Sequence, residues 1–190
     1  MRKPNGYEQV QVHGDYVPLE VGGHYCVIKK VEEMKSKTGL DMLKISLDTA
    51  NNDKQPHYYM DKYRADTRPD KRWGCCIYLV VDENTDYGTG NLKGFVTAVE
   101  NSNPSLQVCW DDRFAECFRN REVGVVFGRE QYKNQQGELK WSTKPKWFRS
   151  LDTVLESPVP DDKYLAGAAC AAASGNSFQE ITDDDGEVPF

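Results

Sequence analysis

Two strand-like segments, residues 25–32 and 41–48, lie close together in the chain and constrain its fold more than any other feature. In the second segment Leu43, Ile45 and Leu47 alternate with residues such as Lys44, which is the period of a strand with one buried face. Between the segments, residues 35–39 form a polar, positively charged and turn-prone loop. The sequence therefore predicts a β-hairpin, with Lys44 pointing away from the core.

The rest of the chain continues this pattern. The segment 57–64 is rich in tyrosine, which favours a third strand. The apolar segment 73–81 fits either a buried strand or a short helix. The later elements that we predict are an amphipathic helix over 91–101 ended by Asn103-Pro104, a short helix over 111–118, and strands over 122–132 and 138–150 joined by a turn at 133–137.

This order of elements is that of the OB-fold, a five-stranded Greek-key barrel with a helix between its third and fourth strands. We therefore expect a mainly β protein, an OB-fold-like barrel with one or two short helices, although other small barrels fit the order almost as well. The expected organisation is an N-terminal extension (1–19), one folded domain (20–157) and a flexible linker with an acidic tail (158–190).

Negative charge is concentrated at the C-terminus. The chain of 190 residues has a net charge of -6, and residues 161–190 hold seven acids against one base, Lys163. Residues 1–160 are therefore neutral, with 23 bases and 23 acids. Within them, residues 113–149 contain nine bases and four acids, a local excess that suits contact with a phosphate backbone.

Several classes of protein do not fit the sequence. No apolar run is long enough to span a membrane, and the first residues do not resemble an export signal, so we expect a cytoplasmic protein. The cysteines and histidines are Cys26, Cys75, Cys76, Cys109, Cys117, Cys170, His13, His24 and His57. Their spacing suits neither a zinc site nor a disulfide framework, so we expect reduced thiols, no metal and no cofactor.

Aromatic residues accompany the bases in the middle and late parts of the chain. Unpaired nucleobases stack on such rings at about 1 to 3 kcal/mol each, while neighbouring cations contact the phosphates. Each single ring could equally well pack in the core, so the cluster carries the argument. The candidate nucleic-acid-binding residues are Lys35, Lys37, Lys44, Tyr58, Tyr59, Lys62, Tyr63, Arg64, Trp73, Arg129, Tyr132, Lys133, Lys140, Trp141, Lys144 and Lys146.

The end of the chain is an acidic run closed by an apolar tip. Such an end can insert Phe190 into a pocket of a partner whose basic rim holds the carboxylates. The candidate partner-binding residues are Asp183, Asp184, Asp185, Glu187, Val188, Pro189 and Phe190. This end resembles the tails of bacterial and phage single-stranded-DNA-binding proteins, from which it differs by Gly186-Glu187 before the tip and by valine where isoleucine is usual.

The body carries a second resemblance. The segments 22–32, 36–39, 93–95 and 125–132, with Trp141, are similar to a phage protein family of Gram-positive hosts that is taken to bind single-stranded DNA. The resemblance implies an OB-fold, sequence-tolerant binding of single strands during replication, recombination and repair, and recruitment of partner enzymes through the tail. It implies no catalytic residues.

Three other functions stay open at this stage. A metal-dependent nuclease would use Glu138 and Lys140, which share a strand face, with Asp111 or Asp112. A pure adaptor would bind protein with the barrel, and a strand-annealing or RNA-binding protein would use the same stacking chemistry. Edge strands that pair between subunits would produce a homo-oligomer, and the sequence leaves the oligomeric state open.

Overall fold

The computed structural model describes residues 2, 17–84 and 86–165. The elements in this part of the chain are β1 (Gly22–Lys35), β2 (Asp41–Thr49), α1 (Tyr58–Ala65), β3 (Cys76–Val80), α2 (Asp86–Ser102), α3 (Phe114–Cys117), β4 (Glu122–Lys133) and β5 (Leu139–Arg149). The predicted partner-binding residues 183–190 lie outside the described residues. Among the residues described, no helix has the length and apolar character needed to cross a membrane.

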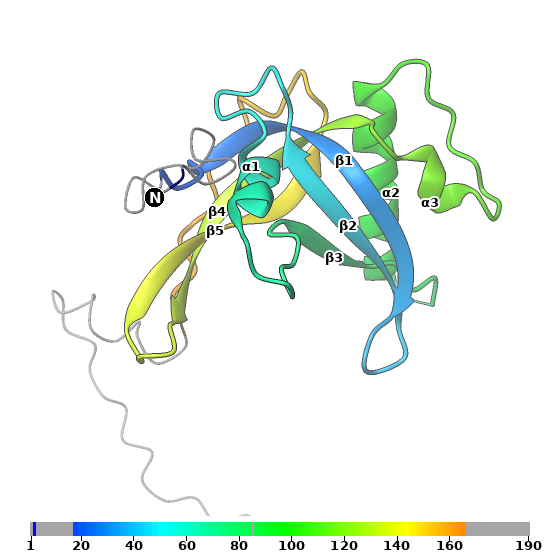
Figure 1. Cartoon of the computed structure of the whole chain (residues 1–190). Coiled ribbons are helices and arrows are strands. Elements are labelled where there is room, and N and C mark those ends of the chain that lie inside the picture. Colours follow the sequence, from blue (N-terminus) through cyan, green and yellow to red (C-terminus); the bar gives the residue numbers. More distant parts are fainter. Residues whose placement is uncertain (1, 3–16, 85, 166–190) are drawn as a thin grey trace, which may run out of the picture.

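The five strands form one antiparallel sheet in the order β3-β2-β1-β4-β5. The predicted hairpin is confirmed as β1 and β2, with Ile28 opposite Leu47 and Val31 opposite Ile45. The sheet is open, since no ladder among the described residues joins β3 to β5, although these two strands are in contact. Figure 1 shows the β1–β2 and β4–β5 hairpins diverging as two arms from a strongly curved sheet.

The prediction of a third strand at residues 57–64 is wrong, because this segment forms α1. Its start is fixed by a carboxylate from β2: Oδ1 of Asp48 accepts hydrogen bonds from the backbone N–H groups of Tyr59 (3.0 Å) and Met60 (3.2 Å). Such a partner satisfies N–H groups that the first turn of a helix leaves free. His57, with a left-handed backbone (φ 54°), turns the chain into the helix. Asp48, nine residues before His57, thus caps the helix and outweighs the β preference of the tyrosines.

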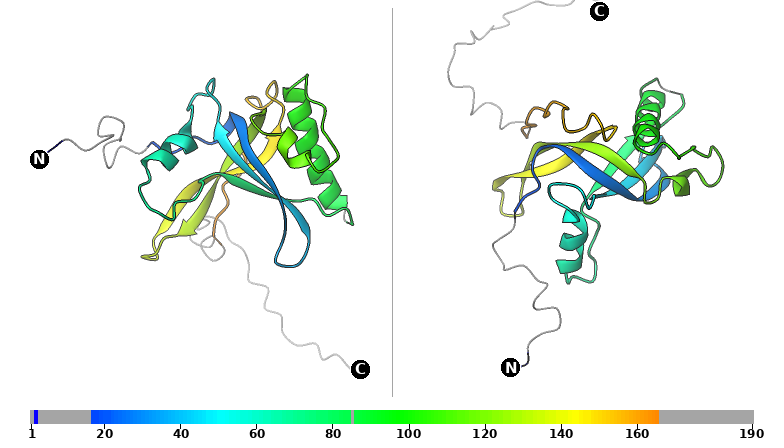
Figure 2. Two further views of the ribbon diagram at one scale, coloured as in Figure 1. Left: turned by 45° about the vertical axis from the view of Figure 1, so that its right-hand side comes forward. Right: turned by 90° about the horizontal axis from the view of Figure 1, so that it is seen from above.

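The ambiguous segment 73–81 forms the edge strand β3, and the predicted helix at 91–101 is confirmed within the longer α2. Figure 2 shows that α1 and α2 lie on different sides of the sheet. From α2 the buried Phe95 packs against Phe118 and Phe148, with ring centroids 4.8 and 4.9 Å apart. Each such buried ring contributes roughly 1.5–3 kcal/mol relative to an exposed one.

The chain after β5 folds back over the sheet. A Cβ atom on Gly23 of β1 would overlap the backbone carbonyl of Val154, so glycine is needed for this close approach. Residues 158–165, the first part of the predicted linker, then follow β4. Lys163 donates its N–H to the carbonyl of Arg129 (3.0 Å) and accepts a hydrogen bond from the N–H of Gln131 (2.9 Å). We refer to residues 161–165 as the strap.

Candidate nucleic-acid interface

A cleft of about 760 Å³ lies between α1 and the β4–β5 hairpin. We call it the basic cleft. Its lining includes Tyr58, Tyr59, Lys62, Arg129, Tyr132, Trp141 and Lys144, which are candidates from the sequence. Lys62, Arg129 and Lys144 bring three positive charges, while Glu20, the acid in the lining, pairs with Lys54 at 2.8 Å. The structure therefore brings seven of the sixteen predicted residues together around one positively charged hollow.

Sequence reasoning missed the segment that joins the two walls, residues 18–21. The backbone N–H of Leu19 donates to the hydroxyl of Tyr58 on α1 (3.0 Å), and the hydroxyl of Thr143 on β5 donates to the carbonyl of Leu19 (2.8 Å). The Leu19 side chain is buried in the core, although the sequence placed it in the N-terminal extension. The short apolar stretch Val17-Pro18-Leu19, directly before the first strand, is the sequence signal that could have indicated this anchor.

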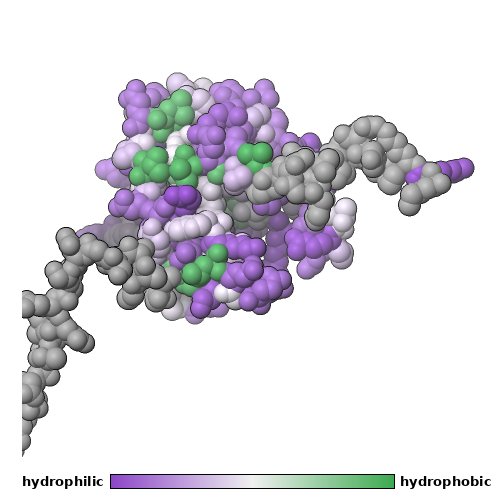
Figure 3. Space-filling view, turned by 90° about the vertical axis from the view of Figure 1, so that its left-hand side faces the viewer, coloured by the Kyte–Doolittle hydropathy of each residue, from purple (hydrophilic) through white to green (hydrophobic). Residues whose placement is uncertain are grey.

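Trp141 is one of the partly exposed rings of the basic cleft. Its side chain is 40% exposed and lies 5.4 Å from the guanidinium of Arg129. Tyr164 of the strap packs edge-on against it, with ring centroids 5.3 Å apart. Figure 3 views the side of the molecule that holds α1 and this hairpin, where hydrophilic side chains surround small, separate apolar patches.

The register of the β4–β5 hairpin divides the predicted residues between its two faces. Trp141 pairs with Gln131 and Thr143 with Arg129, so these side chains share one face. Tyr132 pairs with Lys140 and therefore belongs to the other face, yet Tyr132 also lines the basic cleft. The ring of Tyr132 is 43% exposed. The hairpin thus borders the cleft with residues of both faces.

An acidic residue of the strap, Asp162, forms an ion pair with Arg129 of the basic cleft. Asp162 accepts two hydrogen bonds from Arg129, at 3.0 Å from Nε and 2.6 Å from Nη2. This paired, fork-like geometry is the one in which a guanidinium also binds a phosphate. Both side chains are partly exposed, so the pair contributes little to stability and can be exchanged for another anion.

Other candidates lie away from the basic cleft. Lys35 and Lys44, on the β1–β2 hairpin, pair with Asp41 (2.7 Å) and Glu32 (3.3 Å). Trp73 packs against the core and donates its Nε1–H to the carbonyl of Leu47 (2.7 Å). The remaining candidates, none of which lines the cleft, are Lys37 in the β1–β2 loop, Tyr63 and Arg64 on α1, Lys133 and Lys140 at the end of the β4–β5 hairpin, and Lys146 paired with Glu130.

A buried acid holds the loop after β2 against residues 18–25. Asp53 accepts hydrogen bonds from the backbone N–H groups of Tyr25 (2.8 Å) and Gln55 (2.9 Å), and its Oδ1 lies 2.9 Å from Nδ1 of His24. Burial acts to raise the pKa of this carboxyl, but the hydrogen bonds from His24, Gln55 and Tyr25 outweigh it. The pKa of Asp53 therefore lies below its ordinary value.

This lowered pKa predicts a loss of stability in acid. Asp53 stabilises the fold above its unfolded-state pKa, and this contribution is lost as the pH falls through the lowered folded-state pKa. We expect the difference in unfolding free energy between the wild type and Asp53→Asn to be larger at pH 7 than at pH 3, measured by urea denaturation. An equal difference at both pH values would contradict the role assigned to the carboxylate.

The carboxylates of the nuclease alternative are not brought together. Asp111 lies beside α3 and pairs with Arg113 (2.8 Å), whereas Glu138, in the β4–β5 turn, accepts a hydrogen bond from Asn134 (2.8 Å). These two regions lie at opposite ends of the molecule (Figure 1). Among the residues that the structure describes, no group of three His, Cys, Asp or Glu side chains is placed to hold a metal ion.

Comparison with known proteins gives no family assignment. No protein-family model matches the chain, and no curated protein matches it significantly. A function for the chain therefore has to be inferred from the geometry and charge of the site itself.

Proposed function

We propose that this protein binds single-stranded DNA in the basic cleft, without strong sequence preference. The observation that carries the proposal is the shared lining of one hollow by exposed rings, Trp141 and Tyr132, and by the cations Lys62, Arg129 and Lys144. Stacking on rings is sequence-tolerant because every base has a flat face, and cations beside the rings contact the phosphates. Tyr59 is buried and packs against Phe127, so the proposal gives it a supporting role.

The arrangement of strands supports an OB-fold assignment within this proposal. An OB-fold is a five-stranded, partly open barrel. The open antiparallel sheet, the contact between its edge strands β3 and β5, and the position of α2 and α3 between β3 and β4 agree with that description.

A salt series tests the proposal directly. Fluorescent oligo-dT, the same sequence as RNA, and a duplex of equal length are titrated with the full chain at several salt concentrations. We expect oligo-dT to bind more tightly than duplex, and the logarithm of its affinity to fall with the logarithm of salt concentration with a slope of about -2, as for roughly three phosphate contacts. A salt-independent affinity, or tighter binding of duplex, would overturn the proposal. Tighter binding of RNA would identify an RNA-binding protein.

The strap predicts an effect of one acidic residue. Replacing Asp162 by asparagine frees Arg129 for phosphate, so we expect oligo-dT to bind about two- to fivefold more tightly at low salt, in line with the small free energy of an exposed ion pair. The matched control is Asp161→Asn, which removes an adjacent exposed charge that pairs with no cation among the described residues. Equal effects of the two variants would show that overall charge, and not release of Arg129, is responsible.

The acidic C-terminal end has a separate part in the proposal. We assign to Asp183, Asp184, Asp185, Glu187, Val188, Pro189 and Phe190 the recruitment of replication and recombination proteins. The support is the sequence pattern, an acidic run followed by the apolar residues Val188, Pro189 and Phe190. The experiment is binding of a synthetic tail peptide and of the same peptide without its last residue to candidate replication proteins; equal binding of both peptides would contradict the assignment.

A further inference from the structure

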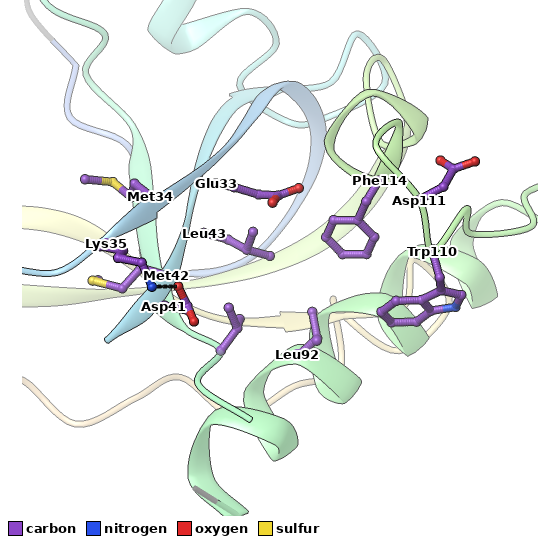
Figure 4. Close-up of a pocket in the computed structure, with 11 residues that line it drawn as sticks. Glu33, Met34, Lys35, Asp41, Met42, Leu43, Leu92, Trp110, Asp111 and Phe114 are labelled. Atoms are coloured by element: carbon purple, nitrogen blue, oxygen red, sulfur yellow. Dashed lines mark hydrogen bonds and ion pairs between the residues drawn. The ribbon is translucent and has the colours of Figure 1, made fainter. Parts of the chain in front are cut away.

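A second hollow, of about 490 Å³, lies between the β1–β2 hairpin and the region of α2 and α3. We call it the apolar pocket. Figure 4 shows Leu43, Leu92, Trp110 and Phe114 gathered around it, with Glu33 above. We propose that the apolar pocket binds a short segment of a partner protein that presents an aromatic or branched apolar side chain next to a lysine or arginine. This inference does not depend on the proposed binding of DNA.

The apolar part of the pocket is built around an exposed indole. Trp110 is 69% exposed, and its ring stacks on Phe114 with centroids 5.2 Å apart and planes 28° from parallel. Leu43 is buried, and Leu92 and Phe114 are partly buried against the core, so they form a firm base. Tryptophan is one of the residue types most often found as the anchor of a protein interface, and stacking on a second ring holds it in place.

The charge of the rim selects the kind of partner. The charged residues of the lining are Glu33, Lys35, Asp41 and Asp111. Lys35 is paired with Asp41 (2.7 Å), and Asp111 is paired with Arg113 (2.8 Å). Among the described residues Glu33 has no ion-pair or hydrogen-bond partner, so its carboxylate is available to a cation of the bound segment.

The same charges exclude two other occupants. After these pairings the charge left on the rim is the carboxylate of Glu33, which repels phosphates, so the apolar pocket does not extend the path of a nucleic acid along the molecule. The chain's own tail ends in Phe190, but its acidic run would meet the unpaired carboxylate of Glu33. The two hollows therefore differ in charge and suit different ligands, phosphates in the basic cleft and a basic apolar peptide in the apolar pocket.

Selection from random peptides tests the proposal. Short peptides are selected on the immobilised full chain, and the recovered peptides are measured by fluorescence anisotropy. We expect sequences with an aromatic or branched apolar residue beside Lys or Arg. Trp110→Ala should weaken their binding at least about tenfold, as for an interface anchor, and Glu33→Gln about two- to fivefold, as for an exposed charge pair.

Matched variants and two further measurements distinguish the apolar pocket from the rest of the surface. Trp141→Ala, which removes an indole of the basic cleft, and Glu156→Gln, which neutralises an exposed acid outside the pocket lining, should leave peptide binding unchanged. The proposal is overturned if the recovered peptides are acidic, if none depends on Trp110, or if oligo-dT competes with them in a Trp110-dependent manner. It is also overturned if sedimentation shows a dimer that Trp110→Ala converts to a monomer, because the occupant would then be a second copy of this chain.

Discussion

Replacing Trp141 by alanine should weaken the binding of oligo-dT by about 1 to 3 kcal/mol, or roughly 5- to 150-fold, which is the range for loss of one stacked base. The ring is exposed, lines the basic cleft and lies beside the guanidinium of Arg129, so a base that stacks on it brings its phosphate close to a cation. The measurement is a fluorescence titration at fixed low salt. Because the ring is at the surface, the unfolding free energy should change much less than the affinity.

The chain contains a close control for this variant. Trp110 is a more exposed indole on the other side of the molecule, and Trp110→Ala should leave oligo-dT binding unchanged. Tyr132→Ala tests whether the bound DNA contacts both faces of the β4–β5 hairpin. We expect it to weaken oligo-dT binding about as much as Trp141→Ala does. If Trp110→Ala weakens DNA binding as much as Trp141→Ala, the basic cleft is not the binding surface.

The elements that the sequence predicted correctly are those specified by local patterns. Alternation of Leu43, Ile45 and Leu47 marked β2, and apolar residues at helical spacing marked α2. Segment 73–81 was ambiguous because a short apolar run fits both a strand and a helix. Its state is settled by pairing of β3 with residues Met42–Ser46, which is a tertiary interaction. The same holds for α1, whose start depends on a carboxylate from β2.

The candidate site was predicted in part for a similar reason. Rings and cations of α1, β4 and β5 line one cleft because the β4–β5 hairpin lies opposite α1. From the sequence they could be selected only as aromatic residues accompanied by bases. Composition could not separate Lys35 and Lys44, which belong to the other hairpin, or Trp73, whose ring packs against the core. Nor could it show that Asp162 pairs with Arg129, since thirty-three residues separate them.

Replacing Asp48 by alanine should lower the unfolding free energy by about 3 to 5 kcal/mol, because two backbone N–H groups of α1 each lose a hydrogen bond to a buried carboxylate. Asp48→Asn keeps an oxygen acceptor at the same place and should cost less. Both unfolding free energies are measured by urea denaturation. The control is Asp61→Ala, which removes an exposed acid from the first turn of α1 and should change the unfolding free energy by less than about 0.5 kcal/mol. Equal losses for Asp48→Ala and Asp48→Asn would assign the effect to charge instead of to the N–H groups.

This variant also links the fold to the basic cleft. Asp48 is outside the lining, but it fixes the start of the helix that carries Tyr58 and Lys62 into the cleft. At a temperature where Asp48→Ala remains folded, α1 should be loosened, and oligo-dT binding should weaken more than in Asp61→Ala. Full affinity in a folded Asp48→Ala protein would show that DNA contacts only the β4–β5 side. The wall formed by α1 would then have no part in binding, and the proposed site would reduce to the hairpin.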